Sequence, residues 1–168
     1  MTLRIMLALS LVSASSAVAG DTKYERATLA GLSGVAVVVE HLDLEVERAG
    51  LTESLIQTDA ELRLRLAGIQ VLGRDEINKD PGRPLLYLFA NIGFGNAAGP
   101  WAYSLSVSVQ QRVKLERATQ ISLLTSTWSV EEVGYNISQS GMADAVRSAL
   151  KDNVDQFINA YLSVNPKK

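Results

Sequence analysis

Polar and apolar residues alternate along the stretch WAYSLSVSVQQRVKL, which runs from position 101 to 115. Odd positions carry Trp, Tyr, Leu or Val, with Gln111 as the exception, and even positions carry Ala, Ser, Gln, Arg or Lys. A period of two residues is typical of a strand with one buried face and one polar face. We therefore predict a long strand whose even positions form a polar surface, called the serine face below after Ser104, Ser106 and Ser108.

The segment QISLLTSTWSV at 120–130 is the predicted partner of this strand, with a turn at 116–120. The register predicts three opposite pairs: Leu115 and Ile121, Val113 and Leu123, and Val109 and Thr127. It also places Leu124, Trp128 and Val130 on the serine face, with Trp128 beside Ser108.

The rest of the chain predicts three further strands and two helices. An apolar run beginning at Gly34 and then alternating to position 46 predicts a strand. The periodicity at 53–67 predicts an amphipathic helix, which the Thr52 side chain would cap. A short strand at 69–72 follows, so this strand, helix and strand favour a parallel pair with a right-handed crossover. Residues 73–84 predict a polar loop, 85–94 a central strand, and 142–162 a second amphipathic helix. The expected fold is α+β: a single mixed β-sheet of about five strands with two amphipathic helices, in the order β-α-β-β-β-β-α.

The first 19 residues have the pattern of a secretory signal peptide. Arg4 precedes an apolar run at 5–12, and Ala17-Val18-Ala19 predicts cleavage after Ala19. The run is too short for a transmembrane segment. We expect residues 20–168 to form a single α+β domain with frayed ends at about 20–30 and 164–168, located in the periplasm.

Composition narrows the classes of partner. The chain contains no cysteine, which excludes a disulfide framework and a thiol-linked lipid anchor. Removing Arg4 with the leader leaves 15 basic and 18 acidic residues, so we predict no binding of nucleic acid.

The one histidine is the only candidate for metal or acid–base chemistry. His41 would share a strand face with Asp43, Glu45 and Glu47 and lies beside Glu40. Pairing with one carboxylate is the commoner arrangement, and the serines have no evident activating base. We therefore predict no catalytic residue, no cofactor and no metal.

The order of elements suggests a class of envelope protein. The apolar strand GVAVVVEHL is followed by a helix opening at GLTESL, a strand after AGIQV, and a long hairpin leading to a C-terminal helix. This order resembles the amino-terminal domain of TolB and the periplasmic domains of curli-secretion and penicillin-binding-protein activator lipoproteins. The resemblance concerns topology, and it implies contact with other envelope proteins rather than catalysis. GLTESLIQTDAELRLRLAGIQV and FINAYLSVNP are also similar to stretches of small exported bacterial proteins.

The leading hypothesis is a non-enzymatic periplasmic protein-binding or scaffold domain of the bacterial envelope. Its partner would be another envelope protein or a second copy, bound at an edge strand or on the serine face. The candidate surface comprises Ser104, Ser106, Ser108, Gln110, Arg112, Ser122, Ser126 and Trp128. Trp128 could instead be covered by residues 21–30 or by a helix.

Two other functions remain open. One is a carrier of a small apolar ligand or lipid, held between helices and sheet by Leu, Phe and Tyr side chains. The other is a hydrolase or metal enzyme centred on His41.

Overall fold

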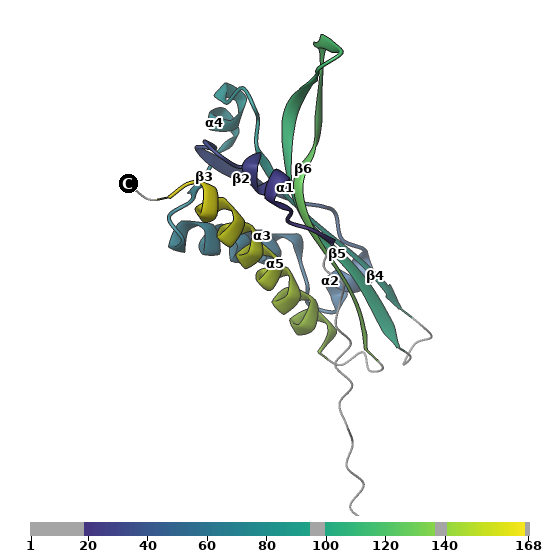
Figure 1. The fold of residues 1–168 in the computed structure, drawn as a ribbon. Coiled ribbons are helices and arrows are strands. Elements are labelled where there is room, and N and C mark those ends of the chain that lie inside the picture. Colours follow the sequence, from purple (N-terminus) through teal and green to yellow (C-terminus); the bar gives the residue numbers. More distant parts are fainter. Residues whose placement is uncertain (1–18, 95–99, 137–140, 167–168) are drawn as a thin grey trace, which may run out of the picture.

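The computed structural model describes residues 19–94, 100–136 and 141–166, which form a sheet covered by helices (Figure 1). The strands are β1 (Ala19–Gly20), β2 (Gly34–Val39), β3 (Gln70–Val71), β4 (Leu85–Phe94), β5 (Trp101–Leu115) and β6 (Ala118–Asn136). The helices are α1 (Lys23–Ala27), α2 (Leu44–Arg48), α3 (Glu53–Leu66), α4 (Arg74–Lys79) and α5 (Met142–Val164). The α+β class is therefore confirmed. The predicted signal peptide lies almost wholly outside the described residues, and its cleavage stays a prediction.

The strands form one mixed sheet in the order β1-β6-β5-β4-β2-β3. β2 runs parallel to β3 and to β4, and the other neighbouring strands are antiparallel. The predicted parallel pair on either side of the first long helix is confirmed, and so is the central place of β4.

The core lies between one face of the sheet and the helices α3 and α5, which run side by side (Figure 1). Thr52 caps α3 by accepting a hydrogen bond from the Leu55 amide at 3.3 Å, as the sequence predicts. The buried odd positions of β5 meet apolar residues of α5, and this core includes Leu105, Val107, Val109, Val146 and Phe157. Because both helices cover this face, the serine face is turned away from them.

Two short helices lie where the sequence predicted the end of a strand and a polar loop. The strand beginning at Gly34 ends at Val39, and the alternating residues after it form α2, in which the amides of Val46 and Glu47 donate to the Asp43 carbonyl. The predicted polar loop contains α4, where the Gly73 amide donates to the Glu76 carboxylate at 2.7 Å. Each helix buries a single side chain, so neither shows a helical period that can be read from sequence.

The N-terminal segment 20–30, expected to be frayed, instead lies along the outer edge of β6 and packs against α5. Thr22 forms a capping box with Glu25 at the start of α1, and Leu29 is fully buried. At the other terminus, α5 continues to Val164, and the Asn165 amide group donates to the Leu29 carbonyl at 2.9 Å. The two terminal segments therefore hold each other, which local sequence patterns do not reveal. Residues 20–29 are called the N-terminal strap below.

Candidate functional site: the projecting hairpin arm

The outer part of the β5–β6 hairpin extends beyond the rest of the sheet (Figure 1). β4 pairs with β5 as far as Leu85, which lies opposite Gln110, so the following residues of β5 have β6 as their strand neighbour. Among the described strands, β1 alone pairs with the far edge of β6, at Val130 and Glu131. Residues 111–125, called the hairpin arm below, therefore form a two-stranded ribbon. Such a ribbon is only marginally stable in water, and a third strand or an apolar surface stabilises it.

Large apolar side chains are exposed on the hairpin arm. Ile121, Leu123 and Leu124 are 48%, 41% and 48% exposed. Leu124 lies opposite Arg112 on the serine face, and Leu123 lies opposite Val113 on the other face. Exposed apolar residues scattered singly are ordinary, whereas a group of them on one projecting element is typical of an interaction site.

A groove runs between the hairpin arm and α4. Its lining comprises Ile77, Arg83, Leu85, Arg112, Ser122, Leu123 and Leu124. Arg83 and Arg112 are exposed, so the groove combines an apolar floor with two guanidinium groups. This combination suits a protein segment that carries both apolar and acidic side chains.

The N-terminal strap covers only part of the outer edge of β6. The Asp21 amide donates to the Ser129 carbonyl at 3.0 Å, and the Thr28 hydroxyl donates to the Thr127 carbonyl at 3.2 Å. Within the described residues, no strand pairs with the edge from 118 to 126. This part is called the free edge below.

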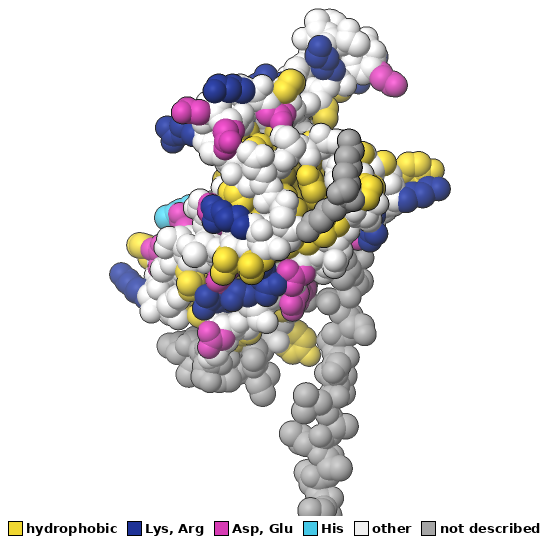
Figure 2. Space-filling view, turned by 90° about the vertical axis from the view of Figure 1, so that its left-hand side faces the viewer, with side chains coloured by type: hydrophobic (Ala, Val, Ile, Leu, Met, Phe, Trp, Pro, Cys, Tyr) yellow, Lys and Arg dark blue, Asp and Glu magenta, His cyan; other side chains and the backbone are white. Residues whose placement is uncertain are grey.

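The free edge lacks the charged and proline residues that commonly prevent edge strands from pairing, and the two register shifts of the hairpin lie near its two ends. The sequence ATQISLLTSTWSV at 118–130 has no charged residue, no glycine and no proline. Edge strands are commonly protected by such residues. The nearest charges are those of Arg112 and Lys114 on the neighbouring strand β5, and Figure 2 shows charged side chains at the tip of the arm and over the helices. Ile121 and Leu123, absent from the predicted surface, could have been found from this uncharged run.

The structure separates the predicted surface residues into two groups. Arg112 and Ser122 line the groove, and Gln110 lies opposite Ser126 at the base of the arm. The other three serines lie farther along the serine face, where Ser108 is buried beside Tyr87. Ser104 and Ser106, the other two of these serines, are half-buried. The surface available to a partner is therefore centred on the hairpin arm and not on the serines at positions 104, 106 and 108.

The prediction that Trp128 lies on the serine face is wrong, and the alternative that residues 21–30 or a helix cover it is confirmed. A register shift follows Val109, so Trp128 rather than Thr127 lies opposite Val109 on the helix-facing side. The Trp128 ring is 0% exposed, packs edge-on against Phe157 at 5.5 Å, and donates its Nε1–H to Asp21 at 2.8 Å.

Of the other two predicted pairs, one is confirmed and one is wrong. Val113 lies opposite Leu123, but Leu115 lies opposite Ala118 because a second register shift follows Lys114. One extra residue turns all later side chains to the other face. Val130, placed on the serine face by the prediction, is likewise buried opposite Val107, whereas Leu124 does lie on the serine face.

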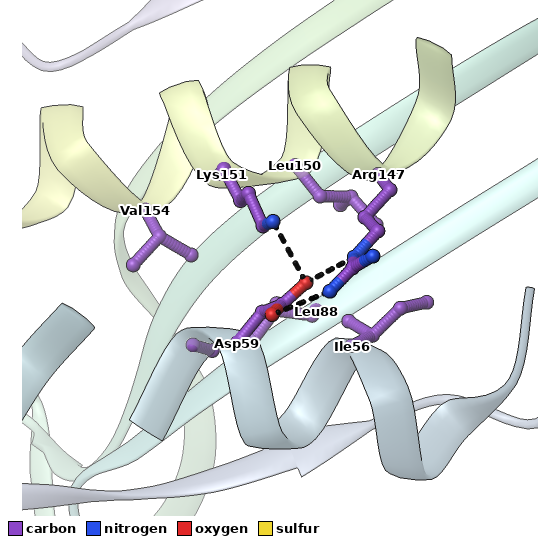
Figure 3. A pocket seen from close by; sticks show the side chains of 8 residues that line it. Ile56, Asp59, Leu88, Arg147, Leu150, Lys151 and Val154 are labelled. Atoms are coloured by element: carbon purple, nitrogen blue, oxygen red, sulfur yellow. Dashed lines mark hydrogen bonds and ion pairs between the residues drawn. The ribbon is translucent and has the colours of Figure 1, made fainter. Parts of the chain in front are cut away.

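Asp59 on α3 forms the main cluster of charges between the two long helices (Figure 3). Arg147 donates two hydrogen bonds to the Asp59 carboxylate, one of them at 2.9 Å, and the Lys151 ammonium lies 3.1 Å from it. The hydrogen bond from Arg147 outweighs the effect of burial and holds the pKa of Asp59 below its ordinary value. Every member of the cluster is paired, so this arrangement joins α3 to α5.

A small pocket beside this cluster corresponds to the place predicted for an apolar ligand. Its lining comprises Ile56, Asp59, Ala60, Leu88, Arg147, Leu150, Lys151 and Val154. The cavity among these residues has a volume of only about 10 Å³, far below the roughly 300–1,000 Å³ of typical ligand pockets. Phe and Tyr, expected in the lining, are not part of it. A larger hollow of about 520 Å³ beside β2, α3 and α4 has charged residues in its lining, among them Glu61, Arg65 and Arg74.

His41 lies at the end of β2 and pairs with a residue that the sequence did not suggest. Its Nδ1 lies 2.6 Å from Glu53 Oε1 at the start of α3, and the Leu42 amide donates to the same oxygen. Both hydrogen bonds lower the pKa of Glu53, and the one with His41 has the larger effect. The prediction that His41 shares a strand face with residues 43, 45 and 47 is wrong because α2 begins at Leu44. Across the described chain, no group of three or more His, Asp or Glu side chains is placed to hold a metal ion.

In comparisons with known proteins, no family model matches this chain and no curated protein matches it. The resemblance to TolB-type and lipoprotein-type domains therefore stays a prediction. None of the helices in the described residues has the length and apolar character needed to cross a bilayer.

Proposed function

We propose that this protein is a non-enzymatic protein-binding domain of the bacterial envelope that docks its partner on the hairpin arm. The observation that carries the proposal is the free edge of β6, which is uncharged and flanked by exposed Ile121, Leu123 and Leu124. A partner strand or apolar segment placed there would pair with unused backbone groups and cover these side chains.

The rest of the molecule supports the same function. Asp59 and Arg147, between the two long helices, are paired with each other, and the pocket beside them is small. The leader pattern at 1–19 supports placing the mature chain in the periplasm, where a partner would be another envelope protein or a second copy.

Changing Leu124 to lysine is expected to abolish partner binding, because a charged side chain at the middle of the free edge disfavours strand pairing. The mature chain, residues 20–168 with a C-terminal tag, is incubated with envelope extract from cells that also produce an untagged copy. Bound proteins are identified by mass spectrometry, so another protein and a second copy are both detectable.

The matched control is Leu66→Lys on α3, because Leu66 is 78% exposed and lies outside the arm. The proposal requires a protein that is captured by the unchanged chain and by Leu66→Lys but is lost with Leu124→Lys. Capture that is the same for all three chains, or no capture by any, would contradict it. Circular dichroism of each variant checks that the fold is retained.

A further inference from the structure

We infer that the partner of the hairpin arm is a second copy of this chain, joined by antiparallel pairing of the two free edges about a two-fold axis at Leu124. This inference rests on the proposed function and specifies its partner. It follows from the direction of the backbone groups, the limits of the free edge and the side chains along it.

The backbone groups of Ser122 and Leu124 point away from β5. The Arg112 amide donates to the Gly82 carbonyl at 2.7 Å, on the side of β5 that faces β4. Since N–H and C=O groups alternate in direction along a strand, those of Val113 point toward β6 and meet Leu123, its opposite residue. Ser122 and Leu124, on either side of Leu123, therefore direct their N–H and C=O groups outward, away from β5.

The limits of the free edge set the register. Regular pairing of β6 with β5 on the arm runs from Ser122 to Ser126, since the register shifts on either side of this stretch. The N-terminal strap covers the edge from Thr127 onward. A two-fold axis at the middle of the stretch passes between the two copies of Leu124. Leu124 then lies opposite its own copy, and Ser122 lies opposite Ser126 of the second copy.

In this register the side chains of the free edge are complementary to those of the same edge in the second copy. The exposed Leu124 side chains of the two copies would contact each other on the serine face, flanked by serines, and Leu123 would lie opposite Thr125 of the second copy on the other face. No charged residue lies between 118 and 130, so no like charges lie directly opposite each other on the paired edges, and the nearest, Arg112 and Lys114, are one strand away on β5. An isologous contact of this kind is the commonest way in which soluble chains form dimers.

The placement of the arm makes the contact accessible. The arm projects from the body of the domain (Figure 1), so antiparallel pairing of two arms would put the two bodies at opposite ends of a shared ribbon. That ribbon would have four strands, β5 and β6 of each copy, instead of the two that are marginal alone. The helices of both copies would lie on the same side of the joined sheet.

Single cysteines test the register directly, because the chain contains none of its own. Residues opposite each other in a hydrogen-bonded antiparallel pair have Cα atoms about 5.5 Å apart, within disulfide range. Leu124→Cys is therefore expected to form a disulfide-linked dimer in the mature chain under mild oxidation. Ser122→Cys, on the same strand and face, would be separated from its own copy by about 14 Å and is expected to crosslink at least about tenfold more slowly.

Sedimentation of the unchanged chain and of Leu124→Lys is measured alongside. A concentration-dependent dimer that Leu124→Lys abolishes, with crosslinking favoured at position 124, supports the inference. A chain that is monomeric at all concentrations, or equal crosslinking at 122 and 124, overturns it. If the chain is monomeric but Leu124→Lys still loses a partner from the envelope extract, self-pairing fails and the proposed function stands. If it is monomeric and no Leu124-dependent partner is captured, both fail.

Discussion

Replacing Trp128 by alanine is expected to lower the free energy of unfolding by about 4 kcal/mol, as for other large aromatic residues in protein cores. The side chain is fully buried against Phe157, and alanine would leave a cavity between β6 and α5. The change would also leave the Asp21 carboxylate without its hydrogen bond from the indole. Because that bond fastens the N-terminal strap to β6, we expect the strap to loosen together with the core.

Chemical denaturation of the mature chain measures this loss. Leu66→Ala serves as the control, since this side chain is exposed on α3, and its effect should stay within about 0.5 kcal/mol. A Trp128→Ala variant as stable as the control would show that Trp128 does not occupy the core. Trp128→Phe should recover part of the stability, because it restores packing without the hydrogen bond.

Asp59→Ala is expected to cost about 2–3 kcal/mol at neutral pH, because Asp59 accepts hydrogen bonds from charged donors. The side chain of Asp59 is 15% exposed, and its loss would leave Arg147 and Lys151 on α5 without their partner. The matched control is Glu61→Ala on the same helix, which removes a surface pair with Arg65 and should cost no more than about 0.5 kcal/mol.

The effect of Asp59→Ala should depend on pH. Because the folded-state pKa of Asp59 lies below the ordinary value of 3.8, its contribution is present above about pH 4. Below that pH the unfolded chain takes up the proton first, so the contribution is lost as pH falls through the folded-state pKa. The difference in stability between the unchanged chain and Asp59→Ala should therefore shrink in acid. A difference that stays constant from pH 7 to pH 3 would contradict this assignment.

The parts of the fold that follow from local patterns were predictable from the sequence. The helix periods, the Thr52 cap and the long alternation of β5 each require only neighbouring residues, and each matches the structure. The parallel arrangement of β2 with β3 also followed, because strand, helix and strand in close succession favour it.

The site depended on features that local patterns do not contain. A single extra residue near Thr127 turned Trp128 from the serine face into the core, and no alternation rule places such a bulge in advance. The strap that covers Trp128 is held by contacts between distant residues, such as Asn165 with Leu29. The free edge was predicted only as a general possibility, since its limits depend on where β4 and the strap stop.

Amide hydrogen exchange along β6, resolved by residue, tests most directly whether the free edge is the docking surface. In a dilute sample of the mature chain, the Ser122 and Leu124 amides should exchange quickly, while those of Leu123 and Thr125, which face β5, exchange slowly. In the complex formed through Leu124, or in a concentrated sample if the partner is a second copy, all four should be protected. Protection of Ser122 and Leu124 already in the dilute chain, or their fast exchange in the complex, would show that the free edge is not the docking surface.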